Sequence, residues 1–155
     1  MIQDFFGVTV EFIDCAFSGR IEKAVFQGSV PEEDRPQFGR ATNEFRGNDF
    51  GDAELVDVAF RGGIDLTEQK LPEGAGYLYL SDAADALGRA RRSVVGWRDL
   101  DLRRKVLAIL KGLEFDVDGG QSQLFLSLNS LPRSQREAAE LLDQELRQAI
   151  QVSTG

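Results

Sequence analysis

Acidic side chains are the groups in this chain with the greatest capacity for chemistry. Asp14, Glu22, Asp49 and Asp57 all lie in its first half, and two carboxylates can act as general acid and base when both face one substrate bond. Nothing in their spacing places two of them on opposite sides of such a bond. The chain also contains no histidine, which removes the commonest general base and the commonest zinc ligand. We therefore expect no catalysis, no metal centre and no cofactor.

Cysteine and glycine add no catalytic signal. Cys15 is the only cysteine, so an internal disulfide is impossible. Its position two residues before Phe17 suggests a small structural side chain instead of a nucleophile. The glycine pairs at residues 62–63 and 119–120 lack the spacing and the following lysine of a phosphate-binding loop. These pairs indicate turns.

The part of the chain that carries these carboxylates and Cys15 has apolar residues with a period of five. Phe45, Phe50, Leu55 and Phe60 are each five residues apart. A helix returns a side chain to one face after three or four residues and a strand after two. A period of five instead suggests a chain that coils through short straight sides and corners. The residues expected to point inward are Phe12, Phe17, Phe26, Phe45, Phe50, Leu55 and Phe60.

The units NEFRG, NDFGD, AELVD and VAFRG, which run from Asn43 to Gly62, resemble consecutive repeats of the pentapeptide-repeat family. VEFID, CAFSG and AVFQG match upstream, at residues 10–19 and 24–28. The resemblance implies a mainly β solenoid, a short right-handed quadrilateral β-helix over residues 1–66, capped by a C-terminal α-helical subdomain. The frame slips by one residue before Ala24, because Ile21 is apolar where Glu22 should be. The pattern is lost over residues 29–42, where we expect a loop.

The second half of the chain has a helical pattern. Residues 67–80 read as a connector and residues 81–155 as a helical capping region of about three helices. Residues 122–128 fit either a strand or a further helical segment. No apolar stretch approaches the ~20 residues of a membrane span, and the acidic start at Asp4 is unlike a signal peptide. The expected location is the cytoplasm.

The net charge also differs between the two halves of the chain. Residues 1–80 carry the whole net charge of −8, whereas acidic and basic side chains balance in residues 81–155. Direct binding to nucleic acid or a membrane is not expected, because phosphate binding needs concentrated Lys and Arg. The acidic excess either serves solubility or faces a basic protein surface. The candidate partner-binding residues are Glu32, Glu33, Asp34, Asp49, Asp52 and Asp57.

The resemblance implies a non-catalytic protein-binding module of the resistance or immunity type, which would neutralise or shield a protein partner such as a toxin. Gyrase protection by mimicry of duplex DNA is the alternative within the family, although seven repeats at four to a coil make a very short rod. A small enzyme is an alternative of another class, and a deep pocket with convergent carboxylates between repeats and helices would favour it. A structural assembly protein is a further alternative. The apolar N-terminal segment with Phe5 and Phe6 predicts a homodimer, because a second copy would cover its exposed edge.

Overall fold

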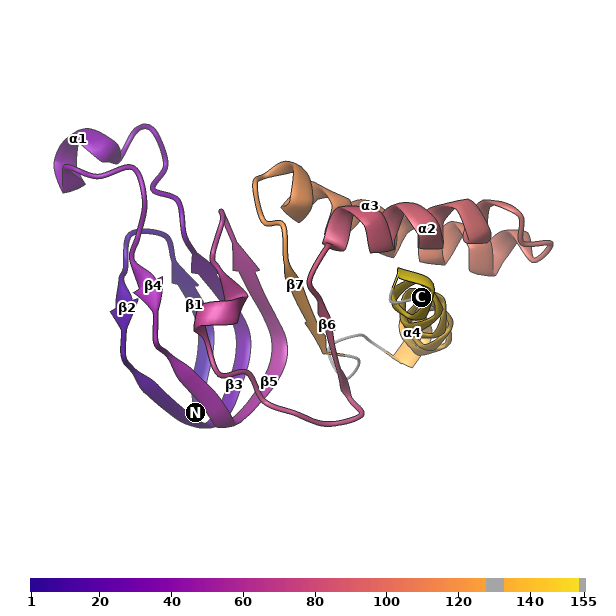
Figure 1. Cartoon of the computed structure of the whole chain (residues 1–155), viewed down its shortest axis with the longest axis horizontal. Helices are drawn as coiled ribbons and strands as arrows, with labels where there is room; N and C mark the ends of the chain where they lie inside the picture. Colours follow the sequence, from indigo (N-terminus) through magenta and orange to yellow (C-terminus); the bar gives the residue numbers. More distant parts are fainter. Residues whose placement is uncertain (128–132, 154–155) are drawn as a thin grey trace.

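The chain folds into a β-rich part, formed by its first half, and a helical part formed by its second half (Figure 1). The computed structural model describes residues 1–127 and 133–153. The first half contains two parallel sheets. The strands β1 (Ile2–Gly7), β3 (Ala16–Gln27) and β5 (Asp49–Arg61) form one sheet in the order β1-β3-β5, and β2 (Phe12–Ile13) pairs with β4 (Phe45–Arg46) in the other.

Phenylalanine rings fill the space between these two sheets. The ring of Phe26 on β3 lies 5.5 Å from those of Phe12 and Phe45 on the two-stranded sheet. Phe50 stacks on Phe17 with ring centroids 4.4 Å apart. Of the seven residues expected to point inward, five are buried and two, Phe12 and Phe17, are partly buried against the same cluster. The five-residue spacing therefore coincides with the side chains that make this aromatic core.

The predicted right-handed, four-sided β-helix is wrong. The described residues form three separate sheets of three, two and two strands, none of them closed, together with four α-helices. The protein is therefore of mixed α/β class and is not a β solenoid. The period of five indicates which side chains face an interior. It does not require strands of equal length, as the four sides of a regular β-helix would. Here β3 and β5 run for 12 and 13 residues, whereas β2 and β4 have two residues each.

The slip in the repeat frame corresponds to an irregularity between β3 and β5. Ala16 lies opposite Asp49, but Ser18 lies opposite Asp52, so β3 has one residue fewer than β5 at this point. Beyond it the two strands are in register, with Ile21 opposite Leu55. Ile21 is consequently buried in the core, which explains why it is apolar.

One level of the three-stranded sheet is occupied by residues with a left-handed backbone. Asp4, Lys23 and Asp57 have φ values of 53°, 52° and 54°. The pairing on either side places the three residues next to one another across the strands. Non-glycine residues adopt this conformation at a cost of roughly 1–2 kcal/mol. The aligned left-handed residues therefore mark a common bend in the three strands.

We expect Lys23→Val to lower the free energy of unfolding by about 1 kcal/mol or more, because a β-branched residue fits the left-handed region poorly. Lys23→Gly should be close to neutral, since relief of strain in the folded chain is offset by greater freedom in the unfolded chain. Urea denaturation of the exposed Lys23 variants measures both. Equal losses from the two substitutions would contradict a backbone origin of the effect.

The second half supplies an antiparallel pair of strands and three longer helices. The strand β7 (Leu124–Ser127) settles the ambiguity over residues 122–128 in favour of a strand, with residue 128 outside the described part. Asp82 and Asp99 cap α2 and α3 by accepting hydrogen bonds from backbone N–H groups of the first turns. The elements of the second half are β6 (Tyr77–Leu80), α2 (Ala83–Val95), α3 (Leu100–Asp118), β7 and α4 (Arg133–Ser153). The first half also contains a short helix, α1 (Arg35–Phe38), within the expected loop, and a 3-10 helix, η1 (Leu66–Glu68).

The helices and the β6–β7 pair enclose a second hydrophobic cluster, distinct from the aromatic core. We call it the helical cluster; it includes Leu87, Val106, Leu110 and Leu146. Within the described ranges, no helix combines the length and the apolar character needed to cross a membrane. Figure 1 shows β6 and β7 between the parallel strands and the helices, so this pair joins the two halves of the molecule.

Candidate functional site

The six acidic residues predicted to bind a partner lie in two separate segments. Glu32, Glu33 and Asp34 precede α1, while Asp49, Asp52 and Asp57 lie along β5. Asp49 accepts a hydrogen bond from Lys70 Nζ at 2.9 Å, and this bond lowers the pKa of its carboxyl. Of the six, only Asp57 lines the pocket described below.

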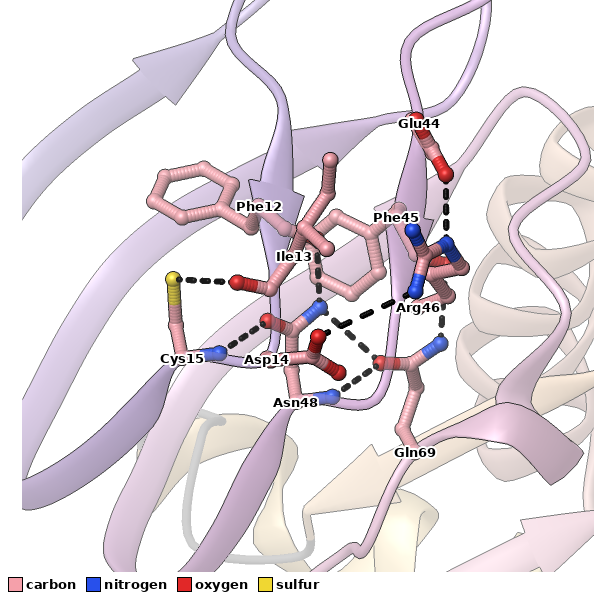
Figure 2. Close-up of polar contacts among 9 residues, drawn as sticks. All are labelled: Phe12, Ile13, Asp14, Cys15, Glu44, Phe45, Arg46, Asn48 and Gln69. Atoms are coloured by element: carbon pink, nitrogen blue, oxygen red, sulfur yellow. Dashed lines mark hydrogen bonds and ion pairs between the residues drawn. The ribbon is translucent and has the colours of Figure 1, made fainter.

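Buried amide side chains form a polar cluster inside the β-rich part (Figure 2). Asn48 Nδ2 donates to Phe12 O at 2.8 Å, and Asn48 Oδ1 accepts from Cys15 N at 3.0 Å. Gln69 Oε1 accepts from Asn48 Nδ2, and Gln69 Nε2 donates to Phe45 O at 2.9 Å. These amides thus satisfy backbone groups between the short strands. We assign this cluster a structural role, because its polar atoms have partners within the chain.

A pocket of about 290 Å³ lies between the two halves of the molecule. The strands β5, β6 and β7 and the helices α3 and α4 supply its lining. Most of the lining is apolar, including Phe60, Leu113, Phe125 and Leu142. We call this space the junction pocket. A concave, largely apolar space with a few polar groups is the usual form of a site for a small molecule.

The polar groups of the junction pocket are short of hydrogen bonds. Four buried side-chain atoms in the described residues have no hydrogen-bond partner: Arg61 Nε, Asp116 Oδ1, Ser127 Oγ and Asp143 Oδ1. All four belong to residues that line this one pocket. Buried polar atoms are nearly always paired with protein or water. Ser127 Oγ and Asp143 Oδ1 have no such partner among the described side chains and backbone groups, so they are the polar atoms that a bound molecule could pair with.

Two of these atoms face each other without forming a well-aligned hydrogen bond. Arg61 Nε and Asp116 Oδ1 lie 2.8 Å apart, an ion-pair distance, but the N–H does not meet the alignment of a hydrogen bond. Asp143 differs, because its other oxygen, Oδ2, accepts from Arg147 Nε at 2.8 Å. The carboxylates of Asp116 and Asp143 are each about nine-tenths buried, with exposed side-chain fractions of 10% and 12%. Each is therefore paired with an arginine, and Asp143 Oδ1 has no hydrogen-bond partner in the described chain.

Burial raises the pKa of Asp116 above its ordinary value, and the positive charge of Arg61 acts in the opposite direction. We expect Arg61→Met to raise the pKa of Asp116 further, because the opposing charge is removed. A carbon-detected NMR titration of the Asp116 carboxyl measures the change. As a control, Arg46→Met removes an exposed arginine that pairs with Glu44 and should leave the pKa of Asp116 unaltered.

The raised pKa of Asp116 also makes the stability of the fold depend on pH. A carboxyl whose pKa is higher in the folded than in the unfolded chain stabilises the fold most below its unfolded pKa, and this contribution is lost as pH rises through the folded value. The loss should extend to higher pH in Arg61→Met than in the parent protein. If Arg61→Met leaves the titration of Asp116 unchanged, the two side chains do not interact as described.

Glycine stands at the pocket where a helix would normally carry a side chain. Gly112 lies inside α3 and lines the junction pocket. A Cβ placed there would meet no other atom within 4 Å, so neither crowding nor a left-handed backbone requires glycine. Glycine in a helix interior costs about 1 kcal/mol relative to alanine. Its effect on the site is to leave the pocket open on the α3 side.

The sequence did not reveal the junction pocket. Its polar residues come from four elements, with Arg61, Asp116, Ser127 and Asp143 far apart in the chain. No local spacing connects them. The one usable signal was Gly112, a helix-breaking residue within an otherwise regular apolar pattern.

No three His, Cys, Asp or Glu side chains converge as a metal site in the part of the chain that the structure describes. The resemblance to the pentapeptide-repeat family stays a prediction that rests on the quoted repeats. Comparisons with family models, curated proteins and solved structures each find no match to this chain.

Proposed function

We propose that this protein binds a small, mainly apolar molecule in the junction pocket and catalyses no reaction on it. The observation that carries the proposal is that the unpaired atoms Ser127 Oγ and Asp143 Oδ1 and the poorly aligned Arg61–Asp116 ion pair all lie in the lining of one pocket. Leaving such atoms unpaired costs about 1–3 kcal/mol each. A bound molecule that pairs with them would remove part of this cost and would gain affinity from it.

The volume of the pocket limits the size of the ligand. A water molecule occupies about 30 Å³ in the liquid, so a space of about 290 Å³ corresponds to roughly ten waters or a ligand of similar atom count. This is the size of a single substituted aromatic ring. Such a molecule would fit the apolar walls formed by Phe125, Leu126 and their neighbours.

Binding without catalysis follows from the partners of the carboxylates. Asp116 lies against Arg61 and Asp143 against Arg147. Arginine stays protonated in proteins and does not act as a base. Among the lining residues that the structure describes, neither carboxylate has a histidine or a lysine beside it with which to share a proton. This arrangement suits recognition of a ligand more than acid–base chemistry.

Gly112→Leu tests the proposal, because the new side chain would project from α3 into open space at the pocket. Indole serves as the probe, and saturation-transfer NMR with the full chain detects its binding. We expect binding to the parent protein and at least tenfold weaker binding to Gly112→Leu. Gly88→Ala, a helical glycine on α2 outside this pocket, should bind indole like the parent. Failure of the parent protein to bind, or equal binding by Gly112→Leu, would refute the proposal.

The same position gives a prediction for stability. Gly112→Ala should raise the free energy of unfolding by about 1 kcal/mol, because alanine restricts the unfolded chain and favours the helix. Its Cβ meets no neighbouring atom within 4 Å, so no clash offsets the gain. Urea denaturation measures the change, with Gly88→Ala as the matched substitution on α2. A loss of stability at position 112 would mean that the glycine is required by the fold.

Protein binding is a second candidate function, favoured by the open side of the three-stranded sheet. The strand β1 pairs only with β3 in the described chain. Phe5, Phe12 and Phe17 near this side are partly buried, and Phe6 on β1 is 64% exposed. Unpaired strand edges beside apolar side chains favour association with another chain. We propose a second copy of this protein as the partner, in agreement with the expectation from the N-terminal sequence.

Sedimentation of the protein at micromolar concentration tests this second candidate. A dimer that Phe6→Asp converts to monomer would support it, and a monomeric parent protein would contradict it. The gyrase-protecting alternative is not retained, because it depended on a rod of stacked coils and the fold contains three open sheets instead.

A further inference from the structure

We infer that the turn between α2 and α3 docks on an anionic lipid surface. Residues 92–105 form this turn together with the adjoining ends of the two helices, and we call this segment the helical tip. Figure 1 shows the tip at the opposite end of the molecule from the parallel sheets. None of its residues lines the junction pocket, so the inference goes beyond the proposed function and does not depend on it.

Basic side chains concentrate at the helical tip, although the chain as a whole is acidic. The tip contains five basic and two acidic residues, whereas the whole chain has a net charge of −8. The basic residues are Arg92, Arg98, Arg103, Arg104 and Lys105. Clusters of about four to eight basic residues attract anionic lipids. The tip therefore has the charge that such a surface requires.

The acidic residues of the tip are held by local partners. Asp99 accepts hydrogen bonds from Asp101 N and Leu102 N, each at 3.0 Å, and so caps α3. Asp101 Oδ2 lies 2.8 Å from Lys105 Nζ, and the charge of Glu137 on α4 also acts on Lys105. The lysine is thus compensated within the chain. Since these partners appear only in the fold, the alternating charges of the sequence did not suggest membrane contact.

Three of the arginines remain for an external partner. Arg92, Arg98 and Arg104 are exposed, and none of them has a carboxylate within 4.0 Å among the described residues. Arg103 differs, because its Nη1 donates to Val95 O at 3.3 Å and so holds the turn. A guanidinium group can donate two parallel hydrogen bonds to a phosphate or a carboxylate. Phosphatidylserine carries both kinds of acceptor.

Apolar side chains project among these arginines. Val95 and Leu100 are 54% and 60% exposed, one on each side of the turn. Trp97 lies between them in the chain and is only partly buried against the helical cluster. Tryptophan is enriched where lipid headgroups meet acyl chains, and apolar side chains with basic neighbours bind at that level of an anionic membrane. The tip thus offers both parts of such a contact.

The combination of charge and apolar surface favours a lipid surface over other polyanions. A nucleic acid backbone would bind the arginines but would leave Val95 and Leu100 in water. An acidic protein would need a hollow that fits these protruding side chains. A fluid bilayer adapts to them. The acidic residues 1–80, at the other end of the molecule, would point away from the negative charge of the bilayer.

Binding to vesicles tests the inference with the full chain. The vesicles contain equal parts of phosphatidylserine and phosphatidylcholine, and sedimentation measures the bound fraction. Trp97 is the only tryptophan, so a shift of its emission to shorter wavelength reports contact at the tip itself. We expect binding at low salt that decreases as salt is added. Binding to phosphatidylcholine alone should be at least tenfold weaker.

Paired variants separate the two parts of the contact. Arg98→Gln should weaken binding to the mixed vesicles about fivefold. Lys23→Gln, which removes an exposed charge from β3, should leave it unchanged. Leu100→Ser should weaken binding about threefold or more and reduce the shift of tryptophan emission. Phe115→Ser, at an exposed position of α3 outside the tip, should do neither.

Contrary results at any of these points overturn the inference. Absence of binding to the mixed vesicles, or equal binding of Arg98→Gln and the parent, would show that the tip does not recognise anionic lipid. Equal binding to phosphatidylcholine alone would remove the role of charge. Tighter binding to heparin or to polyglutamate, with no effect of Leu100→Ser on vesicle binding, would indicate a polyanion or an acidic protein instead. Indole binding in the junction pocket is a separate measurement, so failure here leaves the proposed function intact.

Discussion

Replacement of Phe26 by alanine is expected to lower the free energy of unfolding by about 3–5 kcal/mol, the usual cost of removing a buried phenylalanine ring. This is a large share of the roughly 5–15 kcal/mol that holds a domain folded. Phe26 is 1% exposed and lies at the centre of the aromatic core. Its ring centroid is within 6.0 Å of those of Phe5, Phe12, Phe17, Phe45, Phe50 and Phe60.

The matched control is Phe115→Ala, because Phe115 on α3 has the same side chain but is largely exposed. It should change stability by less than about 0.5 kcal/mol. Phe26→Leu keeps part of the side-chain volume, so its loss of stability should lie between those of the two alanine variants. It also provides a folded variant if Phe26→Ala does not fold. Guanidinium denaturation followed by circular dichroism measures all three. Similar losses from Phe26→Ala and Phe115→Ala would show that the ring cluster does not hold the β-rich part together.

The second large effect is expected at Gln121, a fully buried side chain that joins the two halves of the molecule. Its Oε1 accepts from Gly63 N at 3.1 Å and from Ile64 N at 2.9 Å. Its Nε2 donates to Ile64 O and Gln123 O, each at 2.8 Å. Gln121→Ala leaves four backbone groups without partners, and we expect a loss of about 3–4 kcal/mol after partial rescue by water.

A charge-specific variant of the same position tests the hydrogen-bond pattern. Gln121→Glu keeps the shape but places a carboxylate against two carbonyl oxygens, so at neutral pH it should destabilise at least as much as Gln121→Ala. Burial and the carbonyls should raise the pKa of the new carboxyl in the folded chain. Stability should then be recovered as pH falls towards the ordinary value of about 4.3 and lost again as pH rises.

Thermal unfolding between pH 4 and 8 measures the recovery in Gln121→Glu. The exposed Gln37 on α1 provides the control, and Gln37→Glu should show no such pH dependence. A Gln121→Glu variant with the stability of the parent at neutral pH would contradict the four-bond arrangement.

The inward positions of the first half were accessible from sequence, whereas the fold class was not. Phenylalanine at every fifth residue marks side chains such as Phe26 and Phe50 as inward-facing, and both are buried in the aromatic core. The same spacing says nothing about how the strands end or whether they close. The resemblance supplied the β-helix, and the unequal strands β2 and β3 with an open β1 edge are what overturned it.

The helical half shows the same limit for long-range pairing. A helix cap such as Asp82 or Asp99 is a local signal, of a kind that was accessible from sequence. The partner of β7 was not, because Leu124–Ser127 pairs with a strand more than forty residues earlier. The junction pocket depends on that pairing and on the packing of α3 and α4. Its residues acquire a common role only when the chain has folded, so a search for local motifs could not find them.

The separation of the two hydrophobic clusters has an optical consequence. The chain has a single tryptophan, Trp97, and it packs against the helical cluster. The aromatic core of the β-rich part consists of phenylalanine rings with Tyr77 beside them. Selectively excited tryptophan emission therefore follows the helical half alone, while far-ultraviolet dichroism follows both. A difference in melting temperature between the two signals would show that the two halves unfold separately. Tryptophan emission alone would not detect unfolding of the phenylalanine core.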